Sequence, residues 1–178
     1  GYRTTLATVH LPNSLSKVGS NAFIDTLWYQ NLPDGMVIIG DTLYGYKGSM
    51  PSNTAITVPL GIKYIASFAF SEQSNLTSLT LPEGLREIGY EAFFDCTNLV
   101  TISFPSTLSH IQSRAFMNTA WLNNQADGFV YAGSVLLTHK GLIPMDTPIT
   151  IPNGIKGIAA NALQNQYFLK TITLPDGL

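Results

Sequence analysis

Few residues in this sequence are of the types that carry out covalent chemistry. Histidine occurs only at His10, His110 and His139, and the single cysteine is Cys96. Catalysis needs a nucleophile, a base and an orienting group in one pocket, and no readable motif brings such groups together. The sequence also lacks a His/Cys/Asp cluster at metal-ligand spacing and a Gly-rich phosphate loop. We therefore expect no enzyme activity, no catalytic residue, no cofactor and no metal site, with Cys96 as a buried structural residue.

Hydroxyl-bearing residues are the polar groups that recur at regular spacing. They stand two and four positions before a series of prolines, in extended segments such as 76–81, where Leu79 and Leu81 share one face and Ser78 and Thr80 the other. The candidate ligand-binding residues on this outward face are Thr8, His10, Thr57, Ser78, Thr80, Thr101, Ser103, Thr150, Thr171 and Thr173. Threonine is also a good exposed strand residue, so a purely structural role stays open.

Composition narrows the class of partner. The chain has 178 residues, 45% hydrophobic and 11% charged, with 9 Lys+Arg against 11 Asp+Glu and a formal net charge of -2. Nucleic-acid binding needs a basic stripe, so this balance argues against it. No stretch approaches the ~18 apolar residues of a transmembrane helix. Acidic side chains such as Glu83, Glu87, Glu91 and Asp95 are expected to be solvated surface charges.

The elements that position the hydroxyls come from a repeat. The prolines at 12, 59, 82, 105, 152 and 175 are separated by 47, 23, 23, 47 and 23 residues, so the unit is 23 residues and is interrupted twice. Residues 6–85 and 99–178 align at an offset of 93 with 36 identities in 80 pairs. This indicates two copies of a super-repeat, about 1–93 and 94–178. Because no linker separates the copies and neither end looks like a solenoid cap, we expect one continuous domain, 1–178, that is a fragment of a longer array.

Each 23-residue unit is expected to form the same short series of structural elements. A strand ends at proline, a Pro-x-Gly turn and a second short extended piece follow, and an Ala-Phe pair marks a compact helical or 3₁₀ turn. The interruptions, about 28–50 and 121–143, predict inserted β-hairpins with two-residue loops at Gly40-Asp41 and Gly133-Ser134. Trp28 and Trp121 open these segments, and we expect them to pack beneath the hairpins, although stacking on a ligand is the alternative.

At 76–99 the unit reads Leu-x-x-Leu-x-Leu-Pro-x-x-Leu-x-x-Ile-x-x-x-Ala-Phe-x-x-Cys-x-x-Leu. This pattern resembles the BspA-like class of leucine-rich repeats, and the Trp…Asp-Gly-x-Val…Gly…Leu…Lys-Gly interruptions are similar to segments of bacterial surface proteins. The resemblance implies an α/β, β-rich, right-handed solenoid with a parallel sheet on its concave face. It also implies an extracellular or cell-surface location in a bacterium.

The expected function is non-enzymatic binding or adhesion. The Ser/Thr-rich concave face or the hairpins would recognise a protein or glycan partner, and the resemblance implies that this partner is a host extracellular molecule. The main alternative is a structural spacer that presents another module. More distant alternatives are an enzyme and an ice-binding threonine ladder, and His10, Ala55 and Pro148 interrupt the rows that such a ladder would need.

Overall fold

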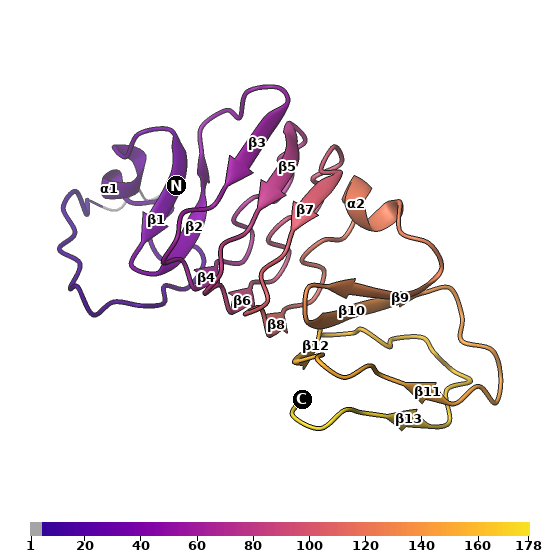
Figure 1. The fold of residues 1–178 in the computed structure, drawn as a ribbon. Coiled ribbons are helices and arrows are strands. Elements are labelled where there is room, and N and C mark those ends of the chain that lie inside the picture. The colour runs from indigo at the N-terminus through magenta and orange to yellow at the C-terminus, as the bar shows by residue number, and fades with distance from the viewer. Residues whose placement is uncertain (1–4) are drawn as a thin grey trace.

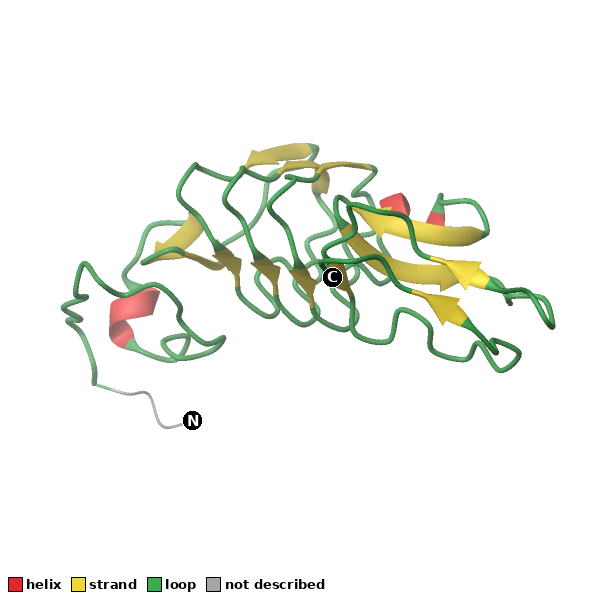
Figure 2. Ribbon diagram, turned by 60° about the horizontal axis from the view of Figure 1, so that its bottom comes forward, coloured by secondary structure: helices red, strands yellow, loops and turns green. Residues whose placement is uncertain are grey.

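The chain forms a stack of coils in which each coil packs against the next. The structure is a computed structural model that describes residues 5–178. Figure 1 shows the coils following one another from the N-terminal to the C-terminal end, and Figure 2 shows two rows of strands on different sides of the stack, joined by loops. A 23-residue unit cannot cover its own apolar face, so this stacking is the physical basis of the fold.

The first row of strands is parallel, as the sequence predicts, but it is divided into two sheets. The strands β3 (Thr54–Thr57), β5 (Leu76–Thr80) and β7 (Thr101–Ser103) form the central sheet, which has parallel pairing throughout. The strands β11 (Ile149–Thr150) and β13 (Ile172–Thr173) form a separate parallel pair. Helix α2 (Ala120–Asn123) follows β7, where the Trp121 N–H donates to the Leu99 carbonyl at 2.6 Å. The inserted segment therefore interrupts the first row after β7.

The second row of strands incorporates the inserted hairpins. Its members β4 (Tyr64–Ile65), β6 (Glu87–Ile88) and β8 (His110–Ile111) pair in parallel. The strands β1 (Gly35–Ile39) and β2 (Thr42–Lys47) are antiparallel to each other, and β2 also pairs in parallel with β4. In the second copy, β9 (Gly128–Ala132) and β10 (Val135–Lys140) pair in the same way, and β10 pairs with β12 (Gly157–Ile158). The second strand of each hairpin thus occupies the position in the second row that the strand of a regular coil would occupy.

Glycine and threonine set the ends of these inserted segments. Gly40 and Gly133 have φ angles of 59° and 60° at the first position of two-residue loops, a conformation that suits glycine. Before each hairpin lies one short helix, α1 (Leu27–Gln30) or α2. The buried hydroxyls of Thr26 and Thr119 cap them by accepting hydrogen bonds from backbone N–H groups three residues on, at 3.1 and 3.2 Å.

The Ala-Phe segments are tight turns rather than helices. We call residues 19–26, 66–73, 89–96, 112–119 and 159–166 the compact turns, and in the structure their inner residues are turns and bends. In the turn 66–73, Phe68 and Glu72 are left-handed, with φ angles of 63° and 64°. A helix cannot continue through such residues, so the expected helical or 3₁₀ turn does not form. Alternate N–H groups, such as those of Phe68, Phe70 and Glu72, donate instead to the next compact turn at 2.7–2.9 Å.

The core runs along the stack as a column of equivalent side chains. The rings of Phe70, Phe93 and Phe116 are fully buried and stacked, with centroids 5.4 and 5.3 Å apart and interplanar angles of 12° and 6°. Cys96 is fully buried, as the sequence predicts, and its Sγ donates to the Phe70 carbonyl oxygen at 3.0 Å. Desolvation by this burial raises the pKa of its thiol to about 12, so the thiol is unreactive at neutral pH.

The two tryptophans pack against phenylalanines of the preceding coil. Trp28 contacts the Phe23 ring edge-on at 5.1 Å, and Trp121 contacts the rings of Phe104 and Phe116 at 5.2 and 5.5 Å. Both indoles are partly buried by these contacts. These contacts account for the tryptophans without a ligand.

Candidate functional site

The hydroxyl-bearing side chains of the central sheet form two rows across the coils. Strand pairing places Thr57 beside Thr80 and Thr80 beside Ser103, and all three are exposed. One step along the strands, Ser78 pairs with Thr101, and Ala55 begins this row. Because neighbouring parallel strands lie about 4.8 Å apart, each row places hydroxyl groups at nearly regular intervals.

The residues between these hydroxyls point into the stack. Leu79 is fully buried, Ile56 is 8% exposed and Ile102 is partly buried. The alternation fixes which face the hydroxyls occupy, because a one-residue slip would turn the apolar side chains outward. The central sheet therefore presents a hydroxyl surface, defined by Thr57, Ser78, Thr80, Thr101 and Ser103, on a buried apolar support.

The other predicted site residues do not join this surface. Thr150 and Thr173 are paired and exposed, but they lie on the separate β11–β13 sheet. Thr171 is exposed and directly precedes β13, while Thr8 and His10 are exposed outside any strand. The ten residues thus occupy three regions, because the inserted segment separates β7 from β11.

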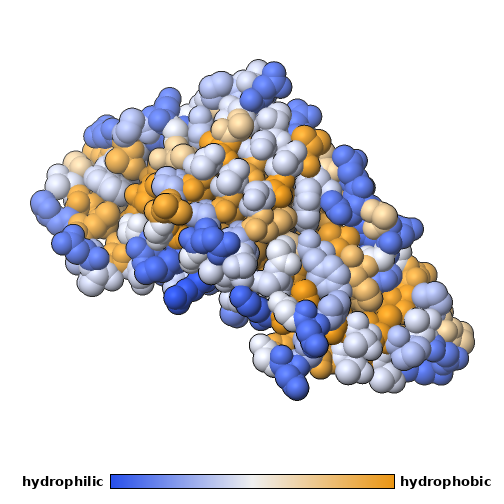
Figure 3. Space-filling model, in the orientation of Figure 1, coloured by the Kyte–Doolittle hydropathy of each residue, from blue (hydrophilic) through white to orange (hydrophobic). Residues whose placement is uncertain are grey.

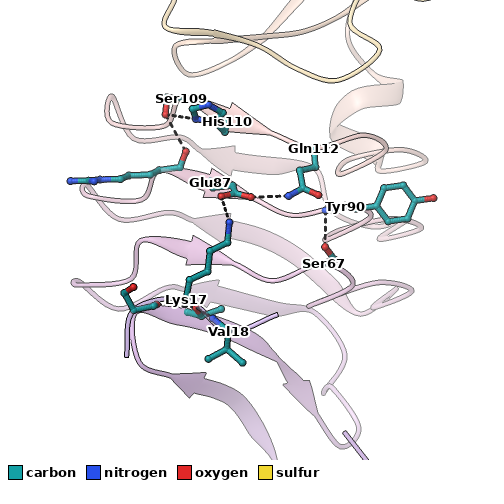
Figure 4. Close-up of polar contacts among 11 residues, drawn as sticks. Lys17, Val18, Ser67, Glu87, Tyr90, Ser109, His110 and Gln112 are labelled. Carbon is teal, nitrogen blue, oxygen red and sulfur yellow. Dashed lines mark hydrogen bonds and ion pairs between the residues drawn. The ribbon is translucent and has the colours of Figure 1, made fainter. Parts of the chain in front are cut away.

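A polar cluster on the second row of strands was missed at the sequence level. Glu87 accepts hydrogen bonds from Lys17 Nζ at 2.5 Å and Gln112 Nε2 at 2.7 Å (Figure 4). Lys17 also lies over the Tyr64 ring, 5.1 Å from its centroid. Desolvation raises the pKa of the Glu87 carboxyl, but the hydrogen bonds from Lys17 and Gln112 outweigh it, and the net pKa is lowered.

The acidic residues expected to be solvated are in fact links between neighbouring coils. Besides Glu87, the carboxylate of Glu91 pairs with Arg114 at 2.6 Å, and that of Asp95 accepts from Asn118 at 2.7 Å. The Glu83 carboxylate accepts from the Ser106 N–H at 2.9 Å. Each of these three bonds joins residues 23 positions apart in the chain. Glu83 is exposed, as expected, whereas Glu87, Glu91 and Asp95 are only partly exposed, so for these three the expectation of simple surface decoration was wrong. A repeat spacing of 23 between an acid and a donor is the signal that could have found most of them.

The histidines show no catalytic arrangement. His110 Nδ1 lies 2.8 Å from Ser109 Oγ on an exposed strand end, as Figure 4 shows, and Lys17 and Gln112 hold the nearby Glu87 carboxylate. His139 packs edge-on against Phe129, with ring centroids 4.7 Å apart. Between residues 5 and 178, no group of three or more His, Cys, Asp and Glu side chains could hold a metal ion. Over the same residues, no helix has the length and apolar character needed to cross a bilayer.

The sequence matches a known family of repeat proteins. Residues 2–123 match six copies of the BspA type leucine rich repeat region. No curated protein matches the sequence significantly. Among solved structures, the chain is similar to the T. pallidum leucine rich repeat protein TpLRR, with 25% identity, a TM-score of 0.49 and coverage of 84% of this chain and 71% of that one.

Two longer proteins are also similar. The pneumococcal vaccine antigen PcpA gives 23% identity and a TM-score of 0.49, with coverage of 94% of this chain and 38% of that one. A leucine-rich repeat protein from Bacteroides ovatus gives 26% identity and a TM-score of 0.40, with coverage of 69% and 26%. The family match spans more than half of the sequence, so the chain belongs to the BspA-type leucine-rich repeat family.

Proposed function

We propose that this chain is a non-enzymatic recognition module that binds a protein or glycan through the hydroxyl surface of its central sheet. The observation that carries the proposal is the in-register pairing of Thr57, Thr80 and Ser103, with Ser78 and Thr101 beside them. Hydroxyl groups both donate and accept hydrogen bonds, so such a surface suits partners rich in hydroxyl or peptide groups.

The surroundings of this surface favour a broad contact over a deep pocket. In Figure 3 the surface over β3, β5 and β7 shows pale residues of intermediate hydropathy with hydrophobic patches between them, and few strongly hydrophilic residues lie on it. Extended surfaces built from repeated strands are the usual binding faces of solenoid proteins. Membership of the BspA-type family supports an extracellular or cell-surface location in a bacterium, and we include that location in the proposal.

Lysine substitution provides the test. The exposed Thr80, Thr101 and Ser103 are replaced together by lysine, and binding is measured against panels of extracellular matrix proteins and glycans. We expect partner capture to be lost while the melting temperature stays within about 6 °C of the parent, because an exposed substitution rarely changes stability by more than ~0.5 kcal/mol and three together by more than about 1.5 kcal/mol.

A matched control separates this surface from the rest of the stack. Thr150→Lys, Thr171→Lys and Thr173→Lys together add the same charge on and beside the β11–β13 pair and should leave capture intact. Equal loss in both variants would indicate a general charge effect and refute the assignment. A parent chain that captures nothing from either panel would favour the alternative function, a structural spacer.

A further inference from the structure

A cavity recurs at the same place in both copies of the 93-residue super-repeat. In the second copy it measures about 210 Å³ and lies between the compact turns 112–119 and 159–166. In the first copy the equivalent cavity measures about 100 Å³. Its lining residues Asn21, Ile24, Tyr29, Tyr44, Gly45 and Phe68 correspond to Arg114, Met117, Leu122, Leu137, Thr138 and Asn161. The two cavities are therefore versions of one site, with different side chains inside.

In the first copy the side chain of Tyr44 provides both ring packing and a hydrogen-bond acceptor at this site. The Tyr44 side chain is buried, only 4% of the residue being exposed, and its ring packs against Tyr29 and Phe23 with centroids 5.8 and 6.4 Å away. Its hydroxyl oxygen accepts a hydrogen bond from the Phe23 backbone N–H at 2.9 Å. That N–H needs such an acceptor because the hairpin stands where the next compact turn would be.

Elsewhere the next compact turn provides this acceptor. The Phe70 N–H donates to the Ala92 carbonyl at 2.7 Å, and the Phe93 N–H donates to the Ala115 carbonyl at 2.8 Å. Phe116 occupies the same position in the following turn, and its ring stacks on that of Phe93. β10 enters the stack after that turn, and the Phe116 N–H makes no hydrogen bond with any residue between 5 and 178.

The second copy lacks the tyrosine that would satisfy this group. Leu137, 8% exposed, stands at the position of Tyr44, and Leu122 stands at the position of Tyr29. Phe116 itself is 1% exposed, and leaving a buried N–H without an acceptor is unfavourable. The larger cavity beside it exceeds the ~150 Å³ that is enough for a benzene ring.

We propose that the second-copy cavity binds a phenol group, with its ring against Leu122 and Leu137 and its oxygen accepting a hydrogen bond from the Phe116 N–H. The ligand takes the place that Tyr44 fills in the first copy. The cavity opens beside the exposed Met117 and Asn161, so the ring reaches it from solvent. The phenol is either a free small molecule or the tyrosine side chain of a partner, and this site is independent of the hydroxyl surface.

The test is a titration of the whole ¹⁵N-labelled chain with p-cresol, which is the tyrosine side chain as a free molecule. We expect a saturable downfield shift of the Phe116 amide proton, with the millimolar affinity typical of so small a ligand. The Phe23 amide is the internal control and should not shift, because Tyr44 already supplies its acceptor. Toluene carries the ring without the oxygen and should leave the Phe116 amide proton in place.

Two variants at one position separate the ring from the oxygen. Leu137→Tyr should abolish the response to p-cresol and raise the melting temperature by about 2–4 °C relative to Leu137→Phe, because only tyrosine offers the Phe116 N–H an acceptor. If either variant fails to fold, the titration of the parent chain decides alone.

The outcomes also distinguish the source of the ligand. A response to p-cresol but not to N-acetyltyrosine amide supports a free phenol, and a response to both supports a tyrosine side chain. An unmoved Phe116 amide, equal responses to toluene and p-cresol, or a stronger response to methyl glucoside would each overturn the proposal.

Discussion

The stacked rings of Phe70, Phe93 and Phe116 lead to a quantitative prediction about how stability is shared along the chain. Phe93 is the middle ring, fully buried, with neighbours 5.4 and 5.3 Å away on its two faces. Truncating a buried phenylalanine to alanine costs about 3–5 kcal/mol, depending on the cavity left behind. Both faces of Phe93 lose a ring contact, so Phe93→Ala should lie near the upper end, at about 4–5 kcal/mol.

Two further variants calibrate this value. Leucine already stands at the equivalent position in the last unit, as Leu163, so Phe93→Leu should cost only about 1–1.5 kcal/mol. Phe168 is 44% exposed, and Phe168→Ala should cost less than about 1 kcal/mol.

Urea unfolding measures all three variants. Circular dichroism reports the whole stack, and the fluorescence of Trp28 and Trp121 reports positions in the two copies. Coincident transitions would license a two-state free energy for each variant. A loss below about 2 kcal/mol for Phe93→Ala, or a loss no larger than that of Phe168→Ala, would refute the view that each coil depends on its neighbours for burial.

Three other predictions follow from particular contacts. Because burial raises the pKa of the Cys96 thiol from 9.0 to about 12, the unfolded chain loses this proton first, so stability should fall between pH 9 and 12. The thiol should also resist thiol reagents at pH 8 until the chain is denatured, and rapid labelling of the native chain would contradict its burial. Gly89→Ala places a Cβ 2.5 Å from the backbone of the preceding coil and should cost about 1–3 kcal/mol of stability. Gly19 stands at the same repeat position with nothing within 4 Å of such a Cβ, so Gly19→Ala should be neutral. Equal melting temperatures for the two variants would disprove the steric argument. The pKa of Glu87 is lowered in the folded chain, so the stabilisation from its ionised carboxylate is present above the unfolded pKa near 4.5 and is lost as pH falls through the folded pKa. Glu87→Gln and Lys17→Ala should therefore each cost up to about 1 kcal/mol at pH 7 and nothing in strong acid. A pH-independent cost measured by urea unfolding would exclude the ion pair as its cause.

The amino-acid sequence by itself determined the repeating part of this protein. The 23-residue spacing and the alternation around Leu79 predicted parallel strands with Ser78 and Thr80 outward, and the structure confirms that pairing. These features follow from side-chain periodicity and from proline and glycine at strand ends, which act within a few residues. The compact turns were located correctly, but the left-handed residues in them, such as Phe68, prevented the helical conformation.

Only the tertiary structure decided how the coils meet at the inserted segments. The interruption between β7 and β11 divides the candidate binding residues, and the ion pair of Lys17 with Glu87 joins positions 70 residues apart. The Phe116 N–H, which has no acceptor among residues 5–178, likewise depends on which coil follows it along the stack, and so does the cavity beside Leu137. The repeat pattern determines which side chains each coil buries and which it exposes. The ion pair, the surroundings of the Phe116 N–H and the cavity depend instead on how neighbouring coils pack where a hairpin replaces a regular coil.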